Sequence, residues 1–149
     1  MIELLRLRKD EAGSTAIEFA IVATTLLIII FGIVDIGRAL YAYDWVADAA
    51  RQGTRFAIVR GQTCSGLSSG CPAQASDVNA YVAGLTLGID SGQVTVTSGC
   101  YLGSAYVSAL PCATPESVQV QVQYNFKFLS PLAYRSWTMR STSQRVVQD

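Results

Sequence analysis

A single apolar run near the N-terminus constrains this chain of 149 residues more than any other feature. Residues 16–36 read AIEFAIVATTLLIIIFGIVDI, and no charged side chain occurs from Phe19 to Val34. At about 1.5 Å per residue, a helix over this run spans about 31 Å, which matches the hydrocarbon core of a bilayer. The run therefore predicts a membrane-spanning helix rather than a buried core helix.

Charges beside the run predict its orientation. Arg6, Arg8 and Lys9 precede it, and basic residues gather on the cytoplasmic side of a membrane. We expect residues 1–13 in the cytoplasm, one span over residues 14–36 and an exported C-terminal part. A cleavable secretory signal has an apolar region of only about 7–15 residues, so the sequence favours a retained anchor in the inner or cytoplasmic membrane.

The composition excludes several classes of function. The chain has no histidine, and its 11 basic side chains balance 11 acidic ones. Without imidazole, a Ser-His-Asp or Cys-His nucleophile and a His-bound zinc or haem are impossible. Zero net charge also lacks the basic excess typical of nucleic-acid binding. We expect no catalytic residue, no cofactor, no metal and no nucleic-acid partner.

Four cysteines lie in the part predicted to be exported, namely Cys64, Cys71, Cys100 and Cys112. An even number in a small exported domain predicts disulfides. We favour pairing Cys64 with Cys71 and Cys100 with Cys112, because each bond closes a short loop rich in Gly and Ser. A zinc site is the weaker alternative, since zinc ligands favour closer C-x-x-C spacing.

Helical periodicity continues beyond the span. One predicted apolar stripe contains Ile36, Leu40, Tyr43, Ala47, Ala50, Ala57 and Ile58, and the opposite charged stripe contains Asp44, Asp48, Arg51 and Arg55. Because no proline interrupts the pattern, we expect one helix from about Ser14 to Val59, with residues 37–60 as an extension beyond the membrane. Tyr41, Tyr43 and Trp45 are predicted at the membrane interface, with an aromatic ligand cage as the less favoured alternative.

Residues 61–149 predict a small αβ head. Residues 61–72 have the composition of a turn, and Ser76 is a candidate N-cap for a short helix that Gly88 ends. Its predicted apolar face consists of Val78, Tyr81, Val82 and Leu85. The fold class is α+β, with this short helix and an antiparallel sheet carried by the long N-terminal helix.

The sheet is predicted from alternation with a period of two. Residues 93–98 and 117–128 alternate in this way, and residues 137–147 predict a third strand, whereas residues 101–110 are a loop or a weak edge strand. In the central strand one face consists of Val118, Val120, Val122, Tyr124, Phe126 and Phe128. The other face is polar, which is typical of an antiparallel sheet with one wet side.

The entry to the span carries an unusual acid, Glu18. A carboxylate in an apolar segment is unfavourable and requires a partner, although an acid in a first helical turn also interacts well with the helix dipole. If a peptidase cut after Gly13, the ammonium group of Ser14 in one helix could pair with Glu18 of a neighbouring helix. Charge would then set the register between assembled helices.

These residues resemble a known family. Gly13, then Glu18 followed by Phe19 before an apolar run, is the pattern of type IV prepilin-like proteins. Residues 13–61, with Glu-Phe-Ala at 18–20 and Ala-Ala-Arg-Gln-Gly-Thr-Arg at 49–55, resemble the TadE-like family of the tight-adherence pilus machinery.

The resemblance implies a minor pilin or pseudopilin that acts in pilus assembly with other pilin-like subunits, in the bilayer and in an extracellular pilus. It also implies a processing site at Gly13 and Ser14 for a prepilin peptidase, and an assembly role for Glu18 and Phe19. Two alternatives stay open from the sequence. One is a membrane-tethered adhesin or binding module, and the other is an uncut assembly scaffold that stays in the membrane.

Overall fold

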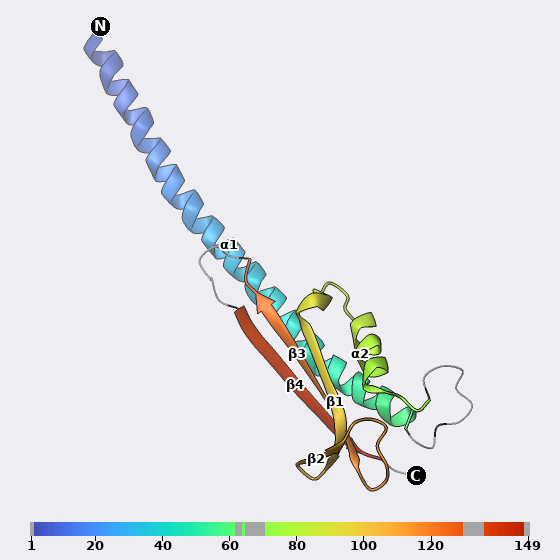
Figure 1. Ribbon diagram of the computed structural model, residues 1–149. Helices are drawn as coiled ribbons and strands as arrows, with labels where there is room; N and C mark the ends of the chain where they lie inside the picture. The colour runs from blue at the N-terminus through green and yellow to red at the C-terminus, as the bar shows by residue number, and fades with distance from the viewer. Residues whose placement is uncertain (1, 62–63, 65–70, 130–135, 148–149) are drawn as a thin grey trace. The chain divides into compact units, whose positions relative to one another are not determined.

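The computed structural model describes residues 2–61, 64, 71–129 and 136–147, and it has the predicted α+β class (Figure 1). Its elements are helices α1 (Ile2–Val59) and α2 (Ala75–Gly84), the short 3-10 helix η1 (Ser91–Gln93), and strands β1 (Val94–Leu102), β2 (Ala105–Ser108), β3 (Ser117–Lys127) and β4 (Ser136–Val146). Residues 62–63 and 65–70 of the predicted turn segment lie outside the described residues.

The chain divides into two compact units. One combines Met1–Arg38 with Phe128–Tyr134, and the other combines Ala39–Lys127 with Arg135–Asp149. Helix α1 begins at Ile2 rather than near Ser14, because the preceding residues are mostly strong helix formers such as Leu, Arg and Glu. The long uninterrupted helix predicted from the absence of proline is thereby confirmed and extended.

The four strands form one antiparallel sheet in the order β2-β1-β3-β4. At its centre, Val122 of β3 lies opposite Val96 of β1 and Ser141 of β4. The predicted alternation of β3 is confirmed, since the side chains that face the helices are buried, namely Val118, Val120, Val122, Tyr124 and Phe126. The segment predicted as a loop or a weak edge strand contains the end of β1 and the short edge strand β2.

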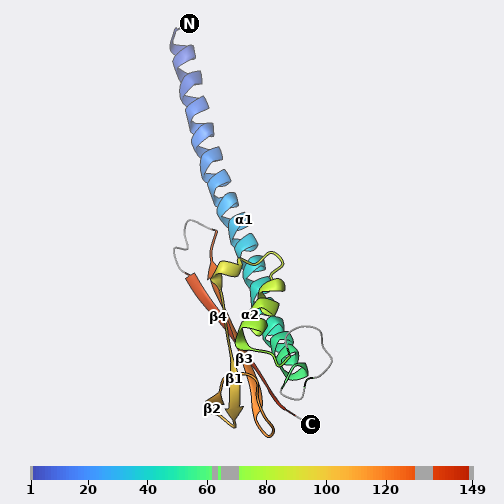
Figure 2. The same ribbon diagram turned by 45° about the vertical axis from the view of Figure 1, so that its right-hand side comes forward.

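Helix α1 packs on this sheet through small residues. In Figures 1 and 2, the C-terminal part of α1 and helix α2 lie on the same face of the sheet. The buried residues of α1 in this unit are Ala42, Val46, Ala49, Ala50, Gly53, Thr54 and Ala57. Short side chains let the helix backbone approach the large aliphatic side chains of β3 closely.

The predicted apolar stripe of α1 is therefore wrong over much of its length. Ala50 and Ala57 are buried, but Ile36, Leu40 and Tyr43 are 62–63% exposed, and Ala47 and Ile58 are only half-buried. Hydrophobicity alone predicts that stripe, whereas close packing of a helix on a sheet favours side chains of small volume. The opposite charged stripe is confirmed, since Asp44, Asp48, Arg51 and Arg55 are all exposed.

Two buried positions of α1 show how close the packing is. A Cβ atom on Gly53 would lie 3.1 Å from Val120 Cγ1 of β3 and 3.2 Å from Val82 Cγ2 of α2. At the next residue, Thr54 Oγ1 lies 2.9 Å from the Ala50 carbonyl and 3.1 Å from the Ser143 carbonyl of β4, and its hydroxyl can donate to either oxygen. Gly53 thus marks the junction of α1, α2 and the sheet.

The start of α2 differs from the prediction. Ser76 lies inside the helix, and Gln74 occupies the N-cap position, where its backbone N–H donates to the Asp77 carboxylate at 2.9 Å. An acid at the third helical position satisfies a free N–H and also interacts well with the helix dipole. The helix ends at Gly84, four residues before Gly88, whose φ of 71° suits the following turn. The predicted face is confirmed at Val78 and Val82, which are buried.

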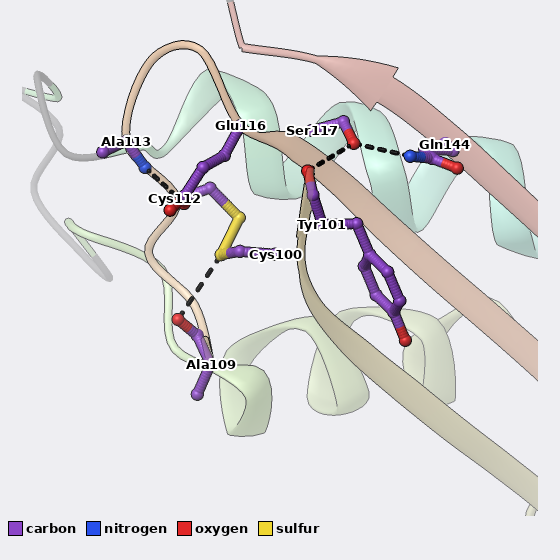
Figure 3. The surroundings of a disulfide bond; sticks show 8 residues. All are labelled: Cys100, Tyr101, Ala109, Cys112, Ala113, Glu116, Ser117 and Gln144. Carbon is purple, nitrogen blue, oxygen red and sulfur yellow. Dashed lines mark hydrogen bonds between the residues drawn. A yellow bond between two sulfur atoms is a disulfide. The ribbon is translucent and has the colours of Figure 1, made fainter. Parts of the chain in front are cut away.

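The structure has disulfides between Cys64 and Cys71 and between Cys100 and Cys112, the pairs expected from their spacing. Figure 3 shows the second bond, which joins β1 to the segment before β3. Both of its cysteines are buried, whereas Cys64 and Cys71 are half-buried. Nearby, Ser117 Oγ donates to the Tyr101 carbonyl at 2.8 Å. The second disulfide is therefore part of the core.

We predict that Gly53→Leu lowers the stability of the head by about 1–3 kcal/mol, because the added side chain has no room between Val82 and Val120. Thermal unfolding of the full chain in detergent, followed by near-UV circular dichroism, measures the effect. The matched control is Gly84→Leu, since nothing lies within 4 Å of a Cβ atom at Gly84. Equal melting temperatures for the two variants would contradict the packing described here.

We also predict that the two disulfides contribute unequally. Replacing Cys100 and Cys112 together by Ala removes the loop constraint, worth about 3 kcal/mol, and also leaves a cavity in the core. Replacing Cys64 and Cys71 together removes a similar constraint from a half-buried site. The first double variant should therefore unfold at the lower guanidinium concentration, and the reverse order would show that the loop before α2 stabilises the head more.

Candidate functional site

The first part of α1 presents apolar side chains in every direction. Within the described residues, one helix is long and apolar enough to cross a membrane, and its most apolar 18-residue stretch is 0% buried. The large exposed side chains are Ile17, Phe19, Ile21, Val22, Leu26, Leu27, Ile28, Ile29, Ile30, Phe31, Ile33 and Val34. Moving one such side chain from water into an apolar environment is favourable by about 1.5–3 kcal/mol. This surface therefore favours lipid or other helices around it.

Glu18 lies at the N-terminal edge of this bare surface. Gly13, Ser14, Glu18 and Phe19 are all on α1 and all exposed, with Phe19 at 75%. Within the part of the chain that the structure describes, Glu18 has no ion pair and no hydrogen bond. Placing an unpaired carboxylate at the centre of a membrane helix costs about 2.5–3.5 kcal/mol, and less near the edge. The described residues supply no counter-charge for this carboxylate.

Next to Glu18, one side of α1 is lined by small side chains. Ala16, Ala20 and Thr24 follow each other at intervals of four residues and so lie on one face. The Thr24 hydroxyl donates to the Ala20 carbonyl at 2.7 Å, and the Thr25 hydroxyl donates to the Ile21 carbonyl at 2.9 Å. Both hydroxyls are thus satisfied inside the helix, and a second helix can approach this face closely.

A second acid at the other end of the apolar run is satisfied within the chain. Asp35 is only 3% exposed, and its Oδ1 accepts hydrogen bonds from Arg38 Nη1 at 3.3 Å and from the Leu129 N–H at 2.9 Å. Asp35 therefore holds the segment after β3 against α1 within the first unit. Sequence reasoning missed this role, and the available signal was an acid inside an apolar run with an arginine three residues later.

Two of the aromatic residues predicted at the membrane interface bind the turn after α2. Tyr41 Oη donates to the Leu87 carbonyl at 2.7 Å, and Trp45 Nε1 donates to the Leu85 carbonyl at 3.0 Å. The Trp45 ring also makes an edge-on contact with Tyr124, with 6.5 Å between centroids. Tyr43 is 62% exposed. Tyr41 and Trp45 therefore fasten the head to α1, a role that their sequence positions do not reveal.

Cys100, Cys112 and Glu116 lie close enough together to suggest a metal site. However, the two sulfur atoms are bonded to each other and are not thiolates, and a Glu116 carboxylate oxygen accepts a hydrogen bond from the Ala113 N–H at 3.0 Å (Figure 3). This group is therefore a disulfide with a local hydrogen bond, and the zinc alternative gains no support from it.

Comparison with known proteins gives one match. The family model described as TadE-like protein matches residues 13–55. No curated protein and no solved structure matches the chain. The matched segment contains the bare apolar surface, Glu18, Asp35 and most of the small buried residues of α1. Residues 13–55 are therefore a TadE-like segment, and the resemblance read from the motifs at Glu18 and at 49–55 is confirmed.

Proposed function

We propose that this protein is a minor pilin or pseudopilin-like subunit of a tight-adherence pilus system. In this proposal, residues 1–13 are a cytoplasmic leader, 14–36 span the inner or cytoplasmic membrane, 37–60 extend the helix, and 61–149 form an exported head. The observation that carries the proposal is a bare apolar helix with an unpartnered Glu18 at its edge, inside a TadE-like segment. The protein acts by assembly rather than by catalysis, as expected of a pilus-associated family.

The assembly contact is electrostatic. Cleavage after Gly13 by a prepilin peptidase leaves an ammonium group on Ser14, four residues from Glu18 and thus on the same face of α1. Each helix then offers one cation and one anion to its neighbours. At 4 Å and an effective dielectric constant of about 20, such a pair gains about 4 kcal/mol, which offsets the cost of bringing Glu18 into lipid.

The same contact sets the register between helices. A shift by one helical turn separates the charges by a further 5.4 Å or so and removes most of the gain. Phe19 and the small face of Ala16, Ala20 and Thr24 then add packing between helices, since small residues allow close approach in lipid. The partners proposed here are other pilin-like subunits and the bilayer itself.

We predict that Glu18→Gln lowers incorporation into pili by about tenfold or more, because each 1.4 kcal/mol lost from the contact is about a factor of ten. Membrane insertion should persist, since the variant makes the span more apolar. Incorporation is measured by immunoblotting sheared pili, and insertion by flotation of membranes. Asp44→Asn, on the exposed charged stripe, is the matched control and should leave both unchanged. Normal incorporation of Glu18→Gln would favour a tethered adhesin or binding module.

We further predict that the mature protein begins at Ser14. Intact-mass spectrometry of the protein purified from membranes should show the loss of residues 1–13, and Gly13→Leu should retain them. Nothing lies within 4 Å of a Cβ atom at Gly13, so this variant leaves the helix itself without a clash. A full-length chain in assembled pili would instead support the uncut scaffold that stays in the membrane.

A further inference from the structure

A groove lies at the C-terminal end of α1. Helix α2 lies beside this end of α1 (Figures 1 and 2). Its volume is about 440 Å³, and its lining residues are Gln52, Arg55, Phe56, Val59, Arg60 and Tyr81. Four of the six belong to α1, Arg60 directly follows the end of this helix, and Tyr81 comes from α2. Neither the TadE-like match nor the proposed assembly of the N-terminal helices assigns a role to this groove.

The aromatic rings of the groove hold one guanidinium in place. Phe56 stacks on Tyr81, with centroids 4.4 Å apart and planes inclined by 18°. The Arg60 Cζ atom lies 4.1 Å from the centroid of the Phe56 ring. At these distances the phenol ring and the guanidinium occupy opposite faces of Phe56. Arg60 is therefore oriented by cation–π contact with Phe56, which fixes the plane of its guanidinium.

One donor of this guanidinium has no acceptor among the described residues. Arg60 Nε is buried and has no hydrogen-bond partner, and within the described residues neither Arg55 nor Arg60 forms an ion pair. A buried charged donor without an acceptor is unfavourable. Arg51 differs, because its Nη2 lies 3.6 Å from Asp48 Oδ1.

The nearby polar groups have other partners. The Asp48 carboxylate accepts a hydrogen bond from Gln52 Nε2 and also lies beside Arg51. The side-chain oxygen Oε1 of Gln52 accepts a hydrogen bond from Tyr81 Oη at 3.3 Å. On α2, Asp77 accepts from the Gln74 N–H at the helix start. Arg55 and Arg60 are thus left without a counter-charge among the described residues.

We propose that the groove binds the carboxylate of an acidic peptide segment from a partner protein. Arg60 presents the flat fork of donors that matches a carboxylate, and Arg55, five residues earlier on α1, supplies a second cation. Phe56, Val59 and Tyr81 provide an apolar wall for the methylene groups that carry the carboxylate in Asp or Glu. Inorganic phosphate has no such apolar part, so the mixed lining favours a peptide.

The location also favours a peptide over a lipid headgroup. Arg55 lies 19 residues beyond Ile36, where the predicted span ends, which corresponds to about 28 Å of helix at a rise of 1.5 Å per residue. A headgroup at the end of the predicted span would thus lie far from both arginines, whereas an exported partner could reach them.

The test uses the full chain, labelled with ¹⁵N, in neutral detergent micelles. The probe is acetyl-tetraglutamate amide, and acetyl-tetraglutamine amide is the neutral control. We expect the glutamate peptide to shift the Arg60 Nε–H resonance and the glutamine peptide to leave it unchanged. Binding should weaken as salt is raised, because exposed charges are screened. No shift of this resonance with the glutamate peptide would overturn the proposal.

Variants locate the binding. Arg60→Gln should lower the affinity for the glutamate peptide about tenfold, and Arg55→Gln should lower it by a smaller factor. The matched control is Arg51→Gln, which removes a cation outside the groove and should leave the affinity unchanged. An equal loss for Arg51→Gln and Arg60→Gln would show non-specific attraction and contradict the site.

Two further measurements keep the outcome clear. Near-UV circular dichroism reports whether each variant is folded. Arg60→Lys keeps the positive charge but loses the planar guanidinium, and it should bind the glutamate peptide several-fold more weakly than the unchanged protein does. Inorganic phosphate and vesicles with anionic lipid are competitors. If either displaces the peptide at equal concentrations of anionic groups, the site recognises anions in general and the assignment to acidic peptides is wrong.

Discussion

The structure depends on one helix that has to satisfy two environments. Along the first part of α1, from Ile17 to Val34, large apolar side chains are exposed on all sides, which suits lipid. From Ala42 onward, the same helix buries a narrow stripe of small residues against the sheet and exposes charged residues. A helix can change its surroundings in this way only if its side chains change while its backbone hydrogen bonds continue, and α1 contains no proline to interrupt them.

The two acids at the ends of the apolar run show what the chain satisfies alone and what it leaves to others. Asp35 is buried, and both Arg38 and the Leu129 N–H donate to its carboxylate. Glu18 is exposed and has no partner among the described residues. A folded chain usually pairs charges that it removes from water. The contrast therefore argues that the environment of Asp35 is intramolecular and that the environment of Glu18 is completed by another molecule.

The parts of the fold that could be predicted were those with a strong period. The alternation of Val118, Val120 and Val122 predicts β3 and its buried face. A shift of the strand by one residue would turn all three valines toward water, so the register is strongly specified. The buried face of α1 was harder, since Ile36 and Leu40 are more hydrophobic than Ala49 but do not fit between helix and sheet. Hydrophobicity predicts what leaves water, whereas volume decides what can pack closely.

The candidate functional residues also divide into those that the sequence pattern indicates and those that only the fold reveals. Glu18 stood out because an acid is unusual in an apolar run, and the local pairs of cysteines stood out by spacing. Asp35 and Trp45 did not, because their backbone partners at Leu129 and Leu85 lie 94 and 40 residues away in the sequence. Long-range contacts of this kind need the fold before they can be recognised.

The net charge of zero does not reveal how the charged residues are paired in the structure. Equal numbers of acidic and basic residues suggest a chain without a charged binding surface, yet several of the acids have local partners. Asp48 lies beside Arg51, Asp77 caps α2, and Asp90 accepts from the Gly92 N–H. Arg55 and Arg60 then lack a counter-charge at the end of α1 within the described residues. Among the described residues, a chain of zero net charge thus carries an anion near its N-terminus and cations in its head without counter-charges, and both of our proposals place another molecule there.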